Sequence, residues 1–389
     1  MAVSPAPAWL AQRLREGGGS VPFRVYMQWA LHDPEHGAYG SGRLQVGPHG
    51  DFATSPSLGP DFAALLAPQI AEWLLQQPQN ESLALLEAGP GEGDLALQLA
   101  QELVRCWPQL ATRTTLVLIE PNPGMAERQR QRLSDCPLPC RWCTPGELAA
   151  RPLRGVLLAH EVLDALPVDR IEWDGALWRR QIVTLHEGQD AEPLLRLEPG
   201  EPLEPLVTAQ LDTLGLLPAG SQRPPGWCSE LHPELAPWLQ AAAAAVHSGV
   251  LLVIDYAHEA WRYYAPQRSN GTLMAYRRQE ACPDPLRQPG HWDLTAHLCL
   301  ESLIAAAQSV GWTLLGQRRQ GEALLALGLA ERLHGLQQQP SVPLAELLAR
   351  REALLRLVDP HTLGDFRWIA FERGPSTSVP RFLTDPPLS

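Results

Sequence analysis

Hydrophobic and polar positions follow two different patterns along this chain of 389 residues. In the first 80 residues, apolar side chains recur every three or four positions, which predicts amphipathic helices at 8–17, 22–31 and 61–77. From Leu83 onward, short apolar runs alternate with helical stretches. The runs that predict strands are 83–88, 115–119, 141–143, 154–159, 250–254 and 312–317. This repeated strand and helix order predicts an α/β fold, a mostly parallel sheet with helices on both faces.

The stretch 166–248 interrupts that order. It contains a predicted β-hairpin with its turn at Asp174–Gly175, and then two helical segments. We interpret it as an inserted α+β cap over the carboxyl edge of the sheet. The tail carries another helix and the run FRWIAFER, which we predict as an edge strand. The predicted units are an N-terminal helical extension with a covering loop (1–80), the first half of the core (81–165), the cap (166–248) and the second half of the core with the C-terminal helix and strand (249–389).

Composition and charge exclude several classes of protein. The net charge of −12 argues against a nucleic-acid binder, which would carry a basic footprint. All 31 basic residues are Arg, so a Schiff-base lysine enzyme and a Walker A ATPase are both excluded. No secretory signal is visible, and no apolar run approaches 18 residues, so we expect no membrane span. Seven scattered cysteines fit a reducing interior, and we expect a cytoplasmic protein.

The turn after the first predicted core strand is rich in glycine. It reads Glu87-Ala88-Gly89-Pro90-Gly91-Glu92-Gly93, which is tighter than the dinucleotide fingerprint because the third glycine comes one position earlier. Such a loop lets the backbone pass close under a ligand without a phosphate, such as S-adenosylmethionine. Glu87 could hold the loop amides or the cationic amino-acid end of that ligand. Glu120, at the end of the second strand, could accept hydrogen bonds from the ribose hydroxyls. The alternative is a generic tight strand-to-helix turn.

Two acids follow the fourth strand, Glu161 and Asp164. Because they are three residues apart, a helical first turn would place both on one face. Two carboxylates beside a sulfonium suit a cationic acceptor such as a guanidinium, which they could orient during methyl transfer. The alternative is that they cap the next helix. His160 could act as a base, or as a hydrogen-bonded structural residue.

A group of three cysteines, Cys136, Cys140 and Cys143, has a C-x-x-x-C-x-x-C spacing that radical enzymes use to hold an iron–sulfur cluster. Its place before the third strand of a doubly wound pattern argues against that cluster. A zinc site with His160 as a fourth ligand is a further option. We favour the interpretation that the three cysteines serve as small apolar side chains, and we predict that they bind no metal.

Several separate stretches together resemble the MidA family of class I S-adenosylmethionine-dependent methyltransferases. They are YMQWALHDPEHGAYG (26–40), GDFATSPSLGPDFAALLAPQIAEWL (50–74), LLEAGPGEGDL (85–95), LAHEVLDALPV (158–168), VIDYAHEAWRYYAPQRSNGTLMAYRR (253–278) and DLTAHL (293–298). The resemblance implies a Rossmann-like core and S-adenosylmethionine as the methyl donor. For the mitochondrial branch it implies symmetric dimethylation of an Arg on a complex I subunit.

The resemblance also implies roles for individual positions. Gly89, Gly91, Gly93 and Glu120 would hold the cofactor, and Glu161 with Asp164 would line the acceptor side. A loop over the cofactor would consist of Gly50, Asp51, Phe52, Thr54, Ser55 and Pro56. The chain departs from the family at Glu92 and Asp94, where a basic residue and Thr are usual. It departs again at 162–163 and 274–279, which leaves the acceptor open.

Further candidates follow the fifth strand. Asp255 could anchor the cap or bind substrate, and Tyr256 ends the same strand. Tyr264 and Arg268 could wall a substrate channel or pack the cap onto the core. Residues 293–295 are expected to cap a helix at 296–309.

We therefore expect a methyltransferase acting on an Arg of a partner protein, such as a subunit of a complex I-like NADH/quinone dehydrogenase. A methyltransferase with a small-molecule acceptor and a non-catalytic assembly factor that binds S-adenosylmethionine are the alternatives. The oligomeric state stays open, a homodimer being one option.

Overall fold

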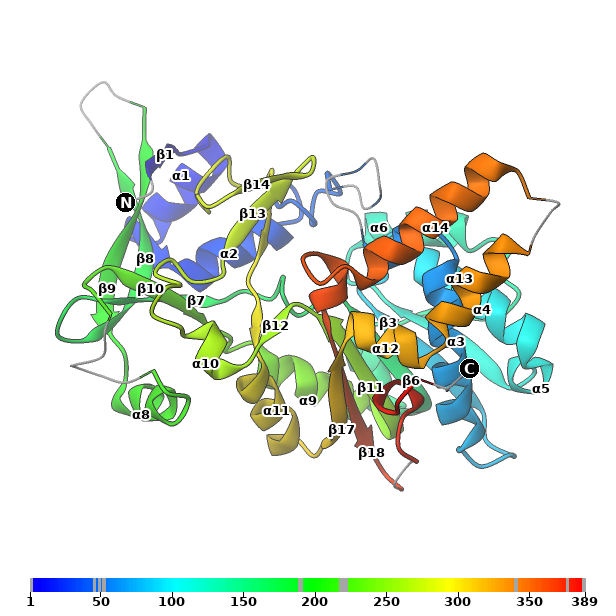
Figure 1. The fold of residues 1–389 in the computed structure, drawn as a ribbon. Coiled ribbons are helices and arrows are strands. Elements are labelled where there is room, and N and C mark those ends of the chain that lie inside the picture. The colour runs from blue at the N-terminus through cyan, green and yellow to red at the C-terminus, as the bar shows by residue number, and fades with distance from the viewer. Residues whose placement is uncertain are drawn as a thin grey trace.

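The computed structural model describes residues 3–44, 47, 50, 54–187, 192–216, 223–338, 342–375 and 378–386. Figure 1 shows two parts side by side, one built on a seven-stranded sheet and one on a six-stranded antiparallel sheet. In the described part of the chain, no helix is both long and apolar enough to cross a membrane.

The seven-stranded sheet has the order β17-β18-β11-β6-β3-β4-β5. The strands are β3 (Leu83–Ala88), β4 (Thr114–Ile119), β5 (Cys140–Trp142), β6 (Leu153–His160), β11 (Val246–Asp255), β17 (Thr313–Arg319) and β18 (Arg367–Arg373). All neighbouring pairs from β11 to β5 are parallel, and β18 is antiparallel to both β11 and β17. This is the mostly parallel, Rossmann-like sheet that the resemblance implied.

The expectation that FRWIAFER forms an edge strand is wrong. It forms β18, which lies between β11 and β17. Its six residues from Arg367 to Glu372 are buried, as an interior strand requires. The strand was misplaced because β18 is the last strand in the sequence but inserts beside β11, and a sequence pattern does not reveal such a long-range pairing.

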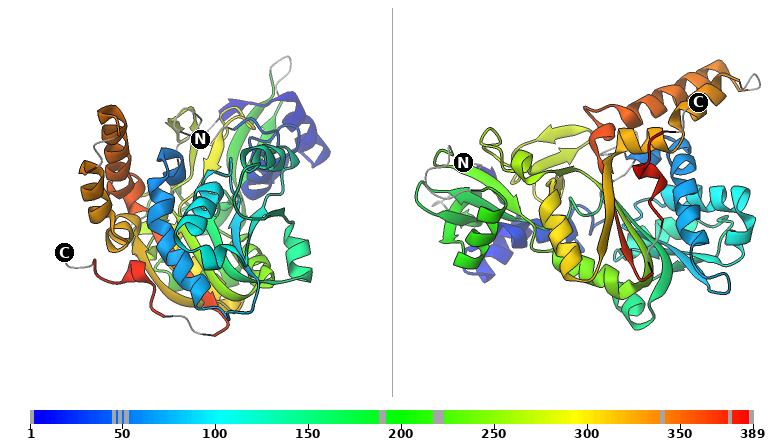
Figure 2. Two further views of the ribbon diagram at one scale, coloured as in Figure 1. Left: turned by 90° about the vertical axis from the view of Figure 1, so that its right-hand side faces the viewer. Right: turned by 60° about the horizontal axis from the view of Figure 1, so that its bottom comes forward.

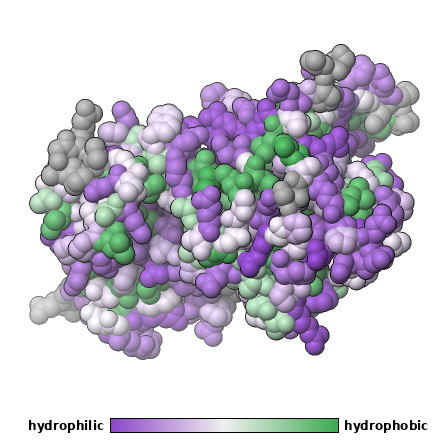
Figure 3. Space-filling view, turned by 90° about the horizontal axis from the view of Figure 1, so that it is seen from below, coloured by the Kyte–Doolittle hydropathy of each residue, from purple (hydrophilic) through white to green (hydrophobic). Residues whose placement is uncertain are grey.

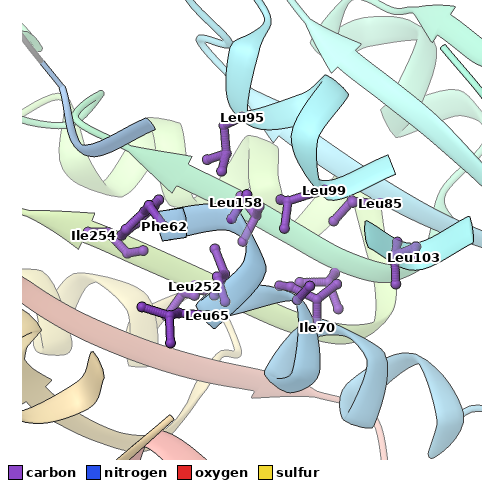
Figure 4. Packing of buried hydrophobic residues seen from close by; sticks show 14 of the residues in the cluster. Phe62, Leu65, Ile70, Leu85, Leu95, Leu99, Leu103, Leu158, Leu252 and Ile254 are labelled. Carbon is purple, nitrogen blue, oxygen red and sulfur yellow. The ribbon is translucent and has the colours of Figure 1, made fainter. Parts of the chain in front are cut away.

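Helices cover both faces of this sheet (Figures 1 and 2). Alternate residues of β3 face opposite sides, with Leu83 and Leu85 in one core and Ala84 and Leu86 in the other. The first core packs against α3 (Asp61–Leu75), α4 (Asp94–Cys106), α12 (Gln320–Ala326), α13 (Leu329–Gln337) and α14 (Leu344–Val358). Figure 4 shows its centre, where leucines of α3 and α4 meet those of β3, β6 and β11. The second packs against α7 (Pro145–Ala150), α9 (Leu235–Ala245) and α11 (Leu300–Ser309).

The six-stranded sheet has the order β1-β9-β8-β7-β10, with β2 paired to β8. Its strands are β1 (Val3–Pro5), β2 (Ser20–Pro22), β7 (Asp169–Trp173), β8 (Trp178–His186), β9 (Leu194–Pro202) and β10 (Trp227–Leu231). The predicted hairpin is confirmed as β7 and β8, paired antiparallel around Asp174–Gly175. The helices α1 (Ala8–Glu16) and α2 (Phe23–His32) pack on this sheet, so the start of the chain and the stretch after β6 share one core. The four unit boundaries stay predictions.

The remaining elements lie around these two sheets. They are η1 (Ser55–Leu58), α5 (Pro108–Ala111), α6 (Pro123–Arg132), α8 (Pro205–Thr213), β12 (Ala257–His258), α10 (Ala260–Tyr263), β13 (Met274–Arg277), β14 (Glu280–Cys282), β15 (Asp293–Thr295), β16 (Leu298–Cys299), η2 (Leu363–Asp365) and η3 (Arg381–Leu383). The expected helix cap at 293–295 is wrong, because these residues form β15 and pair with β13, and α11 begins only at Leu300. On the face seen in Figure 3, hydrophobic side chains gather near the centre and hydrophilic ones surround them.

Candidate active site

A cavity of about 570 Å³ lies at the carboxyl ends of β3, β4 and β6. Ligands of open α/β sheets bind at this edge. Loop residues after each of the three strands line the cavity, and the segment between α2 and Leu44 covers part of it. The candidates that line it are Glu87, Gly89, Gly91, Glu120, Thr54, Pro56, His160 and Glu161.

The glycine loop between β3 and α4 needs glycine for its backbone conformation. Gly89, Gly91 and Gly93 have φ values of 56°, 54° and 88°, which side-chain-bearing residues rarely adopt. A Cβ atom on Gly89 would also lie 3.1 Å from Cγ2 of Val162. Gly93 is the N-cap of α4, so the loop turns directly into a helix N-terminus. The bare main chain of Gly89 and Gly91 therefore faces the cavity.

Glu87 lies under this loop, with only 4% of its surface exposed. Burial and the nearby Asp94 raise the pKa of its carboxyl to about 8, although the Ala96 amide of α4 donates a hydrogen bond to it. Within the described residues, its Oε2 atom has no hydrogen-bond partner. A buried acid with a free oxygen at a cavity wall is suited to a cationic ligand group.

Glu120 follows β4 on the opposite side of the glycine loop. Its Oε1 accepts a hydrogen bond from the Asn122 amide at 2.8 Å, and its Oε2 accepts one from Nε2 of Gln129 at 3.0 Å. Burial raises the pKa of this carboxyl. The sequence reasoning missed both partners. The Asn-Pro pair at 122–123 was a visible helix-start signal, whereas nothing in the pattern marked Gln129.

Asn122 also attaches the N-terminal segment to the cavity. Its Nδ2 donates to the carbonyl oxygens of Tyr39 and Gly40 at 2.9 and 2.8 Å. Its Oδ1 accepts from the amides of Gly124 and Met125, which caps α6. One side chain therefore fixes the covering segment against the strand end that carries Glu120.

Four acids lie close together near the carboxyl ends of β6 and β11: Glu161, Asp164, Asp255 and Asp293. Burial raises the pKa of Glu161 and of Asp164 well above the ordinary values, and repulsion from the neighbouring acids adds to the rise. The expectation of a helical first turn here is wrong, because residues 161–164 form a bend and Glu161 has a φ of 53°. Such a value in a non-glycine residue is typical of functional sites. Glu161 lines the cavity, and Asp164 lies behind it.

Asp255 holds the bend that carries these acids. Its Oδ2 accepts from the amides of Val162, Leu163 and Asp164 at 3.3, 2.9 and 3.2 Å. Its Oδ1 accepts from the amide of Tyr256 at 2.8 Å. With four amide donors on one buried carboxylate, Asp255 is placed to position the loop.

The sequence reasoning took Asp293 for a helix cap and missed its contact with the acids. The Tyr39 hydroxyl, on the covering segment, is hydrogen-bonded to the Asp293 carboxylate. Asp293 thus links that segment to the acidic group.

The other candidates are spread over a wider area. His160 is buried and its Nε2 has no partner among the described residues; burial lowers its pKa to about 3, so it is neutral. Tyr256 stacks on His297 with ring centres 5.2 Å apart. Tyr264 lies in a separate apolar cluster, and Arg268 donates to the Arg262 carbonyl at 3.0 Å, so neither reaches the cavity.

The loop predicted to cover the cofactor is described in part. Thr54 and Pro56 line the cavity. Ser55 is buried: its hydroxyl accepts from Nε2 of Gln320 at 3.2 Å, and its backbone is hydrogen-bonded to Glu161. Gly50 forms a bend, and Asp51 and Phe52 lie outside the described residues.

The departures at Glu92 and Asp94 have partners on α6. Nε of Arg128 lies 3.3 Å from Glu92, and Nη2 of Arg132 lies 2.6 Å from Asp94. Both acids therefore form ion pairs with arginines of α6. Of the three clustered cysteines, Cys140 begins β5 and Cys143 is buried; all three are free thiols. In the described ranges, no three His, Cys, Asp or Glu side chains form a group that could hold a metal.

Comparison with known proteins agrees with this geometry. A family model described as "Putative S-adenosyl-L-methionine-dependent methyltransferase" matches residues 65–318, which is more than half of the chain. The chain belongs to this family. It is an S-adenosylmethionine-dependent methyltransferase of the MidA type.

Two curated relatives of this methyltransferase are both named protein arginine methyltransferases. The protein arginine methyltransferase NDUFAF7 homolog, mitochondrial, of Drosophila melanogaster is 27% identical over 94% of this chain and 85% of its own. The protein arginine methyltransferase NDUFAF7, mitochondrial, of Xenopus tropicalis is 27% identical over 83% of this chain and 75% of its own. The expectation of a cytoplasmic protein is corrected by these relatives, which are named as mitochondrial.

A solved structure resembles the methyltransferase over nearly its whole length. It is a COG1565 superfamily member from Burkholderia thailandensis bound to S-adenosyl-homocysteine, with 27% identity and a TM-score of 0.82. The similarity covers 97% of this chain and 94% of that one. The fold predicted from the sequence is thereby confirmed.

The cavity fits the methyl donor of the family. The free oxygen of Glu87 suits an ammonium group, the Glu120 carboxylate retains acceptor positions for hydroxyls, and the positive-φ glycines keep the space between them open. The bound donor supplies an electrophilic methyl group on a positively charged sulfur.

Proposed function

We propose that this methyltransferase transfers methyl groups to the guanidinium of an Arg on a partner protein. The observation that carries the proposal is the group of four acids beside the cavity, three of them buried and the fourth, Glu161, in the cavity wall. Burial and mutual repulsion raise the pKa of Glu161 and Asp164, and a guanidinium placed among them would relieve both effects. The curated relatives, which are named protein arginine methyltransferases, support the same acceptor.

In this proposal the chain's residues hold and align the two substrates. The loop of Gly89, Gly91 and Gly93 lies under the donor, Glu87 takes its ammonium group and Glu120 its ribose. Thr54 and Pro56, which line the cavity, would cover the donor. Proximity and alignment provide most of the acceleration of a direct displacement.

Glu161 would orient the acceptor guanidinium from the cavity wall, and Asp164 would reinforce it from behind. The guanidinium must lose a proton as it gains the methyl group, and a nearby carboxylate can accept that proton. His160, neutral and with a free Nε2 at the same wall, is placed for a hydrogen bond to the acceptor. Asp255 and Tyr256 position this arrangement.

The resemblance to the MidA family supports a partner of one kind, a subunit of a complex I-like NADH/quinone dehydrogenase. The test is incubation of the purified protein with radiolabelled S-adenosylmethionine and an extract of cells lacking the enzyme, followed by hydrolysis of the labelled protein. We expect label in methylarginine. Glu161→Gln should lower the rate at least 100-fold and change the affinity for S-adenosylhomocysteine less than threefold, because an interaction with the reacting acceptor is lost.

Glu127→Gln is the matched control, because it removes a solvent-exposed carboxylate on α6 and should leave the rate unchanged. Label in a small molecule would refute the protein acceptor. If no molecule in the extract becomes labelled although the protein still binds S-adenosylhomocysteine, the protein is a non-catalytic assembly factor instead.

A further inference from the structure

Gln129 of α6 is fully buried next to the cavity, although it does not line it. Its Nε2 donates to Oε2 of Glu120 at 3.0 Å and to the carbonyl oxygen of Gly91 at 2.8 Å. Its Oε1 accepts from the indole Nε1 of Trp142 on β5 at 3.0 Å. One amide therefore connects the end of β4, the glycine loop after β3, and β5.

These contacts fix the orientation of the amide. Glu120 and the Gly91 carbonyl are both acceptors, and the Trp142 indole is a donor. A flipped amide would place its oxygen against two acceptors and its NH₂ group against a donor. Gln129 consequently has a single hydrogen-bonded arrangement, in which both of its N–H groups are used.

The contacts leave Glu120 ready for a ligand. Each carboxylate oxygen can accept about two hydrogen bonds. Asn122 occupies one position on Oε1 and Gln129 one on Oε2, so an acceptor position remains on each oxygen. Two vicinal hydroxyls are the chemical group that such a fixed pair of acceptors recognises.

We propose that Gln129 is a positioning residue for the ribose of the methyl donor, because it sets the distance between the Glu120 carboxylate and the Gly91 backbone. The proposal rests on the role proposed above for Glu120. It adds a residue that touches neither substrate but fixes two of the groups that do.

The test compares two ligands in wild type and variants by calorimetry. S-adenosylhomocysteine has both ribose hydroxyls, and its 2′,3′-dideoxy analogue has neither. Gln129→Leu should weaken binding of S-adenosylhomocysteine about tenfold, the effect of losing one hydrogen bond to a charged group. It should weaken binding of the analogue less than threefold, because the analogue makes no use of Glu120.

Trp142→Phe is the matched control, since it removes the third hydrogen bond of the same amide without touching Glu120. Its affinity for both ligands should stay within threefold of wild type. Equal losses of affinity for both ligands in Gln129→Leu would overturn the proposal, because a merely structural defect would weaken binding of the two ligands alike. Unchanged affinity for both would overturn it too.

A Glu120→Ala variant distinguishes the proposed role of Gln129 from the proposed role of Glu120 in binding the ribose. If Glu120→Ala binds S-adenosylhomocysteine as wild type does, the ribose is held elsewhere and the proposed cofactor placement fails. If Glu120→Ala loses affinity for that ligand alone while Gln129→Leu does not, Glu120 keeps its role and only the role of Gln129 is refuted.

Discussion

Replacing Glu87 with Gln should remove most of the pH dependence of S-adenosylhomocysteine binding. Burial and Asp94 raise the pKa of the Glu87 carboxyl to about 8. At pH 7 about nine-tenths of the unliganded protein therefore carries a proton there. The ligand's ammonium group, placed at Glu87, would favour the ionised carboxylate and expel that proton.

The size and sign of the effect follow from linkage. If the ligand lowers the pKa of Glu87 from about 8 to below about 5, the association constant rises roughly 50-fold between pH 6 and pH 8. Affinity increases with pH because the complex holds fewer protons than the free protein. Glu87→Gln is close in shape and can still accept from the Ala96 amide, but it has no proton to release.

Calorimetry at pH 6, 7 and 8 in two buffers of different ionisation enthalpy measures the released protons directly. Wild type should release about 0.9 proton at pH 7, and Glu87→Gln close to none. Glu127→Gln, which lacks an exposed carboxylate, should behave as wild type. If Glu87→Gln retains the full release, the proton comes from another group and the ammonium does not bind at Glu87.

The Glu87 carboxyl also affects how the stability of the unliganded protein depends on pH, which gives a second, independent test. Its pKa in the folded state, about 8, lies above the ordinary value of 4.5. Its stabilising contribution is therefore complete below pH 4.5 and is lost as the pH rises through 8. Glu87→Gln should gain stability relative to wild type on going from pH 5 to pH 8, by a few kcal/mol at most. Thermal melting at the two pH values checks this.

Two other substitutions test the architecture of the site. Gly91→Val should abolish detectable S-adenosylhomocysteine binding in calorimetry, because Gly91 lines the cavity and valine disfavours its φ of 54°, and retained affinity would mean that another loop holds the ligand. Gly146→Ala on α7, where a Cβ atom would meet nothing within 4 Å, should bind normally. Asp255→Ala should lower the free energy of unfolding by about 2–4 kcal/mol in denaturant titrations, since four amides lose a buried acceptor, and a change below about 0.5 kcal/mol would contradict its positioning role.

The parallel core could be predicted from the sequence because its signals are local. Buried strands appear in the sequence as apolar runs. The three glycines at 89, 91 and 93 indicate a turn with positive φ values, because glycine adopts them readily. Glu120 was predicted to lie at the ligand edge by the same logic, since it directly follows a strand, and it lines the cavity. Each of these features depends on fewer than a dozen consecutive residues.

The rest depends on pairings between distant segments. β1 and β2 join β9 and β8 across more than 150 residues, and β18 inserts beside β11. Asp293 reaches the acids only because β15 pairs with β13, and Gln129 reaches Glu120 only through the packing of α6. A helix-period pattern marks Gln129 as a polar position and cannot tell that it is fully buried.

The acidic group also bears on the choice of acceptor. Burial raises the pKa of Asp255 to about 7 even though four amides stabilise its charged form, and burial also raises the pKa values of Glu161 and Asp164 well above their ordinary values. At neutral pH the unliganded site therefore holds protons that neutralise part of its charge. A guanidinium stays cationic at every physiological pH, so its entry would replace those protons and ionise the carboxylates around it. A neutral acceptor would gain little from the same group, whereas a cationic one gains charge-assisted hydrogen bonds and a base for the proton it must lose. If the proposed Arg acceptor is correct, the clustering of acids, which is unfavourable for the empty protein, would select a substrate by its charge.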